Sequence, residues 1–188
     1  VIARIEPADD AVLDRAVGIA AAAQKEWAVR SGHDRAQVLS RAARLLREHN
    51  DELARIEVLD VGKVYGEAVS ADVPSGADAM DFFAALAQTD TGDMRRYPDA
   101  IAYCERVPLG VCAGIGAWNY PVQIACWKAA PALAAGNAFI LKPSEMTPLT
   151  AHRVAELLSE AGLPEGLFQI VHGDHTVGRA ICAHPGIA

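Results

Sequence analysis

Three short apolar runs, each followed by a helical pattern, constrain the fold of this chain more than any other feature. The runs cover residues 111–115, 138–141 and 168–171, and helices are expected at about 122–135, 148–161 and 176–183. Continuous apolar runs are typical of parallel strands that are buried on both faces. Because the strands begin about 28 residues apart, the pattern predicts an α/β fold with right-handed crossovers and a doubly wound parallel sheet.

The first 90 residues have helical rather than strand periodicity. We expect helices at about 11–30 and 34–49, a third that Asn50 and Asp51 cap, and a fourth over about 66–88. Pro74 lies inside the fourth and should kink or split it, since proline lacks a backbone donor. Residues 89–99 are polar and predict a loop, and an exposed strand is expected at 101–107.

Composition excludes several function classes. The 188 residues carry a net charge of −7, which argues against nucleic acid or an anionic membrane surface as a partner. No apolar run reaches the ~18 residues of a spanning helix, and no secretory signal opens the sequence. The four cysteines show no paired spacing, so we expect small buried hydrophobes and a reducing, cytoplasmic compartment.

The turn after the first strand carries a candidate donor. The segment Gly114-Ile115-Gly116-Ala117-Trp118-Asn119-Tyr120-Pro121 contains glycines that do not complete a dinucleotide fingerprint, because position 119 is Asn. A neutral side-chain N–H at Asn119 could stabilise an oxyanion without quenching a nearby thiolate. The alternative is that Asn119 only caps the helix that follows.

The turn after the second strand, Lys142-Pro143-Ser144-Glu145, has charge of both signs. A carboxylate at Glu145 could accept both hydroxyls of an adenosine ribose, and Lys142 could assist from the other side. A 2′-phosphate would meet the charge of Glu145, so NAD is expected rather than NADP. The alternative is a solvated ion pair of little energetic weight. After the third strand, Gly173 and Gly178 would let a flat ring approach the backbone, or would serve helix packing alone.

These segments resemble the aldehyde dehydrogenase superfamily, most closely its betaine-aldehyde dehydrogenase branch. Further matches in order and spacing cover residues 60–63, 81–84, 107–110, 130–137 and 160–166. The resemblance implies NAD-dependent oxidation of an aldehyde, with Asn119 as the oxyanion donor. It also implies the cofactor-binding residues, which are Gly116, Ala117, Trp118, Asn119, Lys142, Pro143, Ser144, Glu145, Gly173 and Gly178.

The resemblance extends to three less specific assignments. It places Lys128 in the charge network of the site, although a solvated helix lysine is the alternative. It places Tyr120 and Trp127 around a trimethylammonium group, although a helix aromatic is more often part of a core. It also implies a monovalent cation such as potassium, held by Asp60 with the carbonyl of Met146, although Asp60 could simply cap the end of its helix.

The expected organisation is that of an amino-terminal portion truncated at both ends. Residues 1–98 would form a helical part of the cofactor-binding domain, 99–107 the first strand of an oligomerisation arm, and 108–188 a βαβαβα part of the NAD-binding domain. The nucleophilic cysteine, the general-base glutamate and the catalytic domain are expected beyond Ala188. We expect oxidation of betaine aldehyde to glycine betaine by a homo-oligomer. The alternatives are another aldehyde or semialdehyde dehydrogenase, and a non-catalytic nucleotide-binding or oligomerisation module.

Overall fold

A three-stranded parallel sheet organises the chain. This computed structural model describes residues 3–89 and 92–188. The strands lie in the order β3-β4-β5, with bounds Val111–Ile115, Ala138–Lys142 and Phe168–Ile170. In the central strand β4 every side chain is buried, as expected for a parallel strand with neighbours on both sides. The predicted fold class is therefore confirmed.

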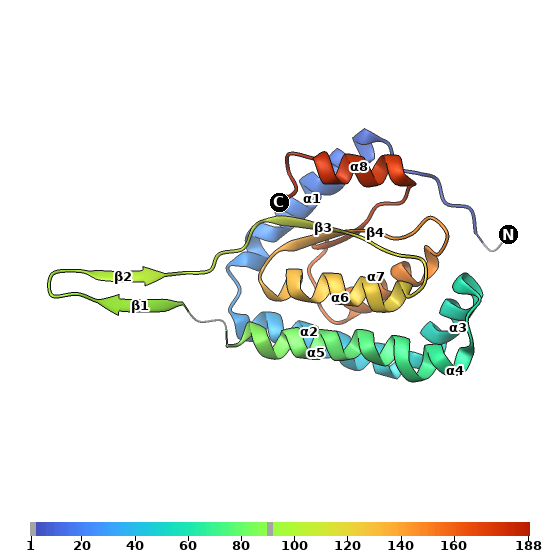
Figure 1. Cartoon of the computed structure of the whole chain (residues 1–188), viewed down its shortest axis with the longest axis horizontal. Helices are drawn as coiled ribbons and strands as arrows, with labels where there is room; N and C mark the ends of the chain where they lie inside the picture. The colour runs from blue at the N-terminus through green and yellow to red at the C-terminus, as the bar shows by residue number, and fades with distance from the viewer. Residues whose placement is uncertain (1–2, 90–91) are drawn as a thin grey trace.

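Helices cover both faces of this sheet (Figure 1). On one face lie α6 (Pro121–Ala134) and α7 (Leu149–Glu160), and on the other α1 (Asp10–Ala28) and α8 (His175–Ala183). A further layer, α2 (Gly32–Glu48) with α5 (Val73–Ala87), packs against α6 and α7. After α8 the chain returns to β3, where the N–H of Ala188 donates to the Val111 carbonyl at 2.9 Å.

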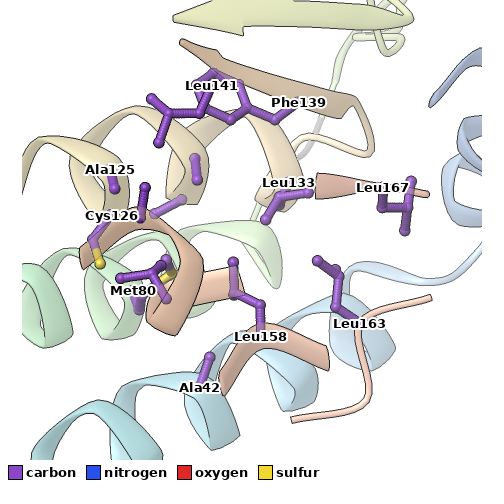
Figure 2. Close-up of a cluster of buried hydrophobic side chains, with 14 of the residues drawn as sticks. Ala42, Met80, Ala125, Cys126, Leu133, Phe139, Leu141, Leu158, Leu163 and Leu167 are labelled. Carbon is purple, nitrogen blue, oxygen red and sulfur yellow. The ribbon is translucent and has the colours of Figure 1, made fainter. Parts of the chain in front are cut away.

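The core is continuous between the sheet and the two helical layers beside it. Figure 2 shows Leu141 of β4, Leu133 of α6, Leu158 of α7 and Met80 of α5 in one buried cluster with Ala42 of α2. Val38, Leu39, Ala42 and Leu46 form the buried face of α2. In the described parts of the chain, no helix is both long enough and apolar enough to cross a bilayer.

Polar side chains at the helix starts explain three of the boundaries. Asp9 accepts a 2.8 Å hydrogen bond from the N–H of Val12 at the start of α1, and Ser31 and Asp174 cap α2 and α8 in the same way. Each accepts from an N–H group that has no partner inside the helix.

The predicted cap of the third helix needs correction. The third, α3 (Asn50–Val61), is preceded by His49 without a side-chain cap, and Asn50 instead donates to the Val69 carbonyl at 2.9 Å. The fourth is interrupted near Pro74, as predicted, and consists of three elements, which are α4 (Tyr65–Glu67), a π-helical turn η1 (Ala68–Asp72) and α5. Pro74 lies in the first turn of α5, where its missing N–H is tolerated because the preceding turn is widened.

A two-stranded hairpin projects from the body of the protein (Figure 1). Strand β1 (Asp93–Arg96) pairs antiparallel with β2 (Ile101–Cys104). The prediction of a loop over residues 89–99 is therefore wrong at β1, and so is the prediction that residues 1–98 are helical. Residues 90 and 91 of that loop lie outside the described part of the chain. All eight strand residues are exposed, so Asp93–Arg96 shows no alternation that could have revealed a strand.

The expectation of buried thiols holds for only part of the set. Cys126 is buried and Cys112 is half-buried, whereas Cys104 on β2 and Cys182 on α8 are exposed. Burial raises the pKa of the Cys126 thiol to about 12, so it remains a protonated, apolar group. Strand or helix propensity alone did not show which face these residues occupy.

Candidate functional site

The turns that follow β3 and β4 are joined through their backbones. The N–H of Gly116 donates a 2.7 Å hydrogen bond to the carbonyl of Lys142. A Cβ atom on residue 116 would lie 3.2 Å from the Cα atom of Pro143, so a larger residue would force the two turns apart. Gly116 therefore allows the carboxyl ends of two adjacent strands to form one continuous edge.

The side chains of Lys142 and Glu145 form an ion pair at this edge. Lys142 is only 3% exposed, and its Nζ donates to the Pro143 carbonyl at 3.0 Å and to Oε2 of Glu145 at 3.3 Å. Glu145 is exposed, and its pKa is lowered by a hydrogen bond from its own backbone N–H and by Lys142. The alternative of a fully solvated pair does not fit, because the ammonium group is buried while the carboxylate stays available.

Four of the predicted cofactor-binding residues line one pocket. It has a volume of about 510 Å³, and Gly116, Lys142, Glu145 and Gly178 all contribute to its wall. A Cβ atom on Gly178 would lie 3.6 Å from Cδ1 of Ile115 and 3.7 Å from Cε of Lys142, so it would occupy space that the glycine leaves open. The lack of side chains at two positions thus shapes a concave surface beside a carboxylate.

Gly173 belongs to a neighbouring pocket of about 420 Å³ rather than to the first. Glu145 lines both pockets, and His172 and Val177 line the second. The φ angle of Gly173 is +155°, and a Cβ atom there would lie 2.2 Å from the Val177 side chain. Packing against α8 is therefore sufficient to explain this glycine.

The candidate oxyanion donor lies on the exposed turn before α6. Ala117, Trp118 and Asn119 are all exposed. The N-cap position of α6 is Tyr120, and the side chain of this residue makes no capping hydrogen bond. The alternative that Asn119 is only a helix cap is therefore wrong, and its amide is not committed to that helix. In the second turn, the hydroxyl of Ser144 accepts from the N–H of Met146 at 3.2 Å, which shapes the turn.

Lys128 lies beside the end of β3. It is exposed on α6, yet a Cβ atom on Gly114 would lie 2.9 Å from its Cδ atom and 2.7 Å from the ring of Phe139. The aliphatic part of Lys128 thus packs over the backbone of β3. Lys128 is therefore not a freely solvated lysine, and it does not line the pocket of Lys142 and Glu145. Its place in a charge network stays a prediction.

The two aromatic side chains predicted near the substrate contact different elements. The Nζ atom of Lys63 lies 4.2 Å from the ring centroid of Tyr120. Trp127 donates from Nε1 to the Ser75 carbonyl of α5 at 3.3 Å and is 51% exposed, so it is not a core residue. The enclosure of a cation by both rings stays a prediction, because each ring has its own neighbours.

Helix α3 supplies carboxylates to the starts of α6 and α7, the helices that follow the turns after β3 and β4. Oε2 of Glu57 accepts from the N–H of Val122 in α6 at 3.3 Å and from the Thr150 hydroxyl of α7 at 3.0 Å. Oδ2 of Asp60 accepts from the N–H of Leu149 at 2.8 Å. Negative charge at a helix N-terminus is favourable, so the carboxylates of α3 hold the starts of α6 and α7 and the turns that precede them.

Glu57 was not among the sequence-predicted site residues. It is fully buried, and burial raises the pKa of its carboxyl to about 7. The signal was present, because Leu53, Ala54 and Glu57 share one helical face and the first two are apolar. A glutamate on the buried stripe of an amphipathic helix indicates a specific internal partner.

Asp60, one of the two expected cation ligands, contacts the start of α7. Asp60 caps α7, and α3 itself ends at Gly62, which has a φ of 80° and donates to the Val58 carbonyl. The alternative that Asp60 caps its own helix is therefore wrong. Burial raises the pKa of Asp60, Met146 is exposed, and no cluster of three or more His, Cys, Asp or Glu side chains occurs among the described residues. Binding of a monovalent cation here stays a prediction.

Comparison with known proteins identifies the family. The model of the aldehyde dehydrogenase family matches residues 1–188. This chain belongs to the aldehyde dehydrogenase family. It is 39% identical to the aldehyde dehydrogenase KauB from Pseudomonas aeruginosa, with a TM-score of 0.95. It is 40% identical to a gamma-glutamyl-gamma-aminobutyraldehyde dehydrogenase from Burkholderia cenocepacia J2315, with a TM-score of 0.94.

A third aldehyde dehydrogenase was crystallised with NAD. It is the indole-3-acetaldehyde dehydrogenase AldA of P. syringae in complex with NAD+ and IAA, at 37% identity and a TM-score of 0.95. The chain is covered over 99%, 100% and 99% in these three matches and spans 38% of each solved chain. The aldehyde dehydrogenase sequence described here thus corresponds to well under half the length of each of these relatives.

Proposed function

We propose that the protein is an NAD-dependent enzyme that oxidises an aldehyde to a carboxylic acid, and that this chain carries its ribose-binding site and an oxyanion donor. The observation that carries the proposal is the joined edge of β3 and β4. There Gly116, Lys142, Glu145 and Gly178 line one pocket beside the turn of Asn119. Ligands of open α/β sheets bind outside the carboxyl ends of the strands.

The residues of this edge fit the adenosine half of NAD. The carboxylate of Glu145 can accept hydrogen bonds from two ribose hydroxyls. Its own backbone N–H and then Lys142 lower the pKa of this carboxyl, and the hydrogen bond from Lys142 holds it in place. A 2′-phosphate would be repelled by the same charge, which favours NAD over NADP. When bound, the nicotinamide supplies the hydride acceptor for aldehyde oxidation.

Asn119 would act on the aldehyde rather than on the cofactor. Addition of a thiolate to a carbonyl carbon places negative charge on the carbonyl oxygen, and a neutral amide N–H stabilises that charge. Loss of one such donor typically lowers turnover by ~10²–10³. We assign the nucleophilic thiol to none of the four cysteines of this chain.

For the substrate, betaine aldehyde is the more specific hypothesis. This hypothesis rests on the aromatic rings of Tyr120 and Trp127. Tyr120 lies next to Lys63, and Trp127 donates to the Ser75 carbonyl. Rates on betaine aldehyde and on succinate semialdehyde, measured on the protein from the complete reading frame, separate this hypothesis from a semialdehyde dehydrogenase. A higher kcat/KM for succinate semialdehyde would exclude the quaternary-ammonium hypothesis.

The hairpin supports the proposal of a homo-oligomer. Met94, Ile101 and Tyr103 are 66%, 56% and 77% exposed on β1 and β2. A hairpin with no buried side chain is marginally stable by itself, and association would cover these apolar groups. Light scattering of the protein with Ile101→Lys and Tyr103→Lys should show a smaller assembly than the wild type.

The proposed cofactor site can be tested with thiol chemistry. Cys182 is exposed and lines the pocket of Lys142 and Glu145, whereas Cys104 is an exposed thiol on the hairpin. We expect saturating NAD to slow alkylation of Cys182 by iodoacetamide and to leave Cys104 unaffected. Equal protection of both thiols, or of neither, would contradict binding in this pocket.

A further inference from the structure

A buried cluster of charged side chains lies under the turn of Asn119 and has no role in the proposed chemistry. The buried charge cluster consists of Glu57 in α3, Lys63 after α3 and Asp72 in η1. Their side chains are 0%, 10% and 1% exposed. Nζ of Lys63 forms an ion pair with Oδ2 of Asp72 and lies 3.6 Å from Oε1 of Glu57. Removing three charged groups from water costs free energy, which ion pairing and hydrogen bonds offset only when the geometry is good.

Two contacts run from this cluster to the residues on either side of Pro121. Glu57 accepts from the N–H of Val122, which is the first N–H of α6 because Pro121 has none. Lys63 lies under the ring of Tyr120 at 4.2 Å from the centroid, within the range of a cation–π interaction. Tyr120 directly follows Asn119 in the chain, so both contacts restrain the backbone that carries the amide.

The turn itself offers little other support. Residues 117–120 are exposed, and the N-terminus of α6 has no capping side chain of its own. The carboxylate of Glu57 replaces that cap from a distant part of the sequence and from a fully buried position. Its Oε1 atom has no hydrogen-bond partner among the described residues, so Oε2 carries the hydrogen bonds and Oε1 faces the ammonium of Lys63.

We propose that Glu57 and Lys63 are positioning residues that hold the Asn119–Tyr120 turn so that the Asn119 amide meets the developing oxyanion. This rests on the proposed role of Asn119. Glu57 fixes the start of α6 through Val122, Lys63 fixes the ring of Tyr120, and Asp72 holds Lys63. A displacement of about 1 Å in a catalytic group can lower the rate ~10²-fold, so restraint of an exposed turn has a measurable consequence.

The test uses the protein expressed from the complete reading frame and compares Glu57→Leu with Glu57→Gln. The leucine variant removes the acceptor for the Val122 N–H, so we expect kcat to fall roughly 10- to 100-fold with the KM for NAD unchanged. Hydrogen exchange at Val122 should become faster. The glutamine variant keeps an acceptor oxygen and should restore most of kcat and the protection of Val122.

A double-mutant cycle separates positioning from a general loss of structure. If Glu57 acts through Asn119, Glu57→Leu should cause little further loss of kcat in an Asn119→Ala background. Glu52→Leu is the matched control, because Glu52 lies on the same helix but pairs with Arg153. It should leave both kcat and exchange at Val122 unchanged.

The outcomes distinguish this proposal from the proposed function. Unchanged exchange at Val122 in Glu57→Leu, or an equal loss of kcat in both backgrounds, overturns positioning by Glu57. An unchanged kcat in Asn119→Ala alone overturns the oxyanion role, whereas the exchange measurement still decides whether Glu57 orders the turn. If Glu57→Leu does not fold, Lys63→Met takes its place in the cycle, and an undiminished kcat in that variant overturns the proposal.

Discussion

The indole N–H of Trp27 donates a 2.8 Å hydrogen bond to the carbonyl of Leu133, 106 residues further along the chain. Trp27 is fully buried at the end of α1, and Leu133 lies in the last turn of α6. Arg35 and Gln24 donate to the neighbouring carbonyls of Ala134 and Gly136. Side chains from α1 and α2 thus satisfy the acceptors that a helix leaves unpaired at its C-terminus.

Replacement of Trp27 by phenylalanine should destabilise the chain by about 1–3 kcal/mol, because the buried site would lose the indole hydrogen bond and part of the packed ring, although the Leu133 carbonyl keeps the N–H of Gly136 as a donor. The matched control is Trp118→Phe at a position that is 58% exposed, where a change below about 0.5 kcal/mol is expected. Urea unfolding followed by circular dichroism gives both values. Equal effects of the two substitutions would contradict the importance of the hydrogen bond.

Glu57 should make stability depend on pH. Its pKa is raised to about 7 in the folded chain, mainly by burial, against a reference value of 4.5. The folded state therefore holds a proton that the unfolded state releases between these values. The free energy of unfolding should fall as pH rises from about 4.5 to about 7, by on the order of 3 kcal/mol.

The comparison between wild type and Glu57→Gln isolates this effect from other titrating groups. The amide cannot ionise, so the variant should gain stability relative to the wild type between pH 5 and pH 8. Urea midpoints at the two pH values measure the difference. A wild-type advantage that grows with pH would show instead that the ionised carboxylate is the stabilising form.

His172 should remain neutral well into the acidic range. Its pKa is lowered to about 4 by burial, by His152 and by Lys142. The Nε2 atoms of His152 and His172 are 2.8 Å apart, so one of them donates and the other accepts. NMR titration should show the ring of His172 neutral at pH 5.5, and His152→Phe should raise its pKa. A midpoint near 6.5 would contradict the packing described for this ring.

Gly114 should not tolerate a side chain. A Cβ atom there would lie 2.7 Å from Cζ of the buried Phe139 ring, so Gly114→Ala should cost about 1–3 kcal/mol through overpacking. Gly18→Ala in α1 is the control, because nothing lies within 4 Å of its Cβ position. There the helix should gain about 0.5–1 kcal/mol. Thermal unfolding midpoints should shift in opposite directions for the two variants.

Most of the fold follows from periodicity, and the exceptions have physical causes. The parallel strands were identifiable because continuous apolar runs such as residues 138–141 are buried on both faces. Strand β1 was not, since Asp93–Arg96 is paired only with β2 and none of its side chains is buried. The π-helical turn before α5 depends on how the chain accommodates Pro74, which a hydrophobic pattern does not encode.

The candidate site was predictable only where it lies on strand ends. Lys142 and Glu145 were identified because both lie on the turn that ends the second predicted strand, and the structure joins their side chains. Glu57 acts through Val122 and Thr150, which are 65 and 93 residues away in sequence, and such partners depend on the packing of α3 across α6 and α7. The separate surroundings of Tyr120 and Trp127 likewise arise from tertiary contacts with Lys63 and Ser75.

The hydrogen bond between Gly116 and Lys142 has an evolutionary consequence. On the proposed assignment, the turn of Glu145 binds the nucleotide, the turn of Asn119 faces the aldehyde, and the two share this backbone contact. We therefore expect substitutions in one turn to alter the other, which would couple changes in cofactor preference to changes in substrate preference. An engineer who exchanges Glu145 to admit a different dinucleotide should expect to retune the Asn119 turn in the same round of selection.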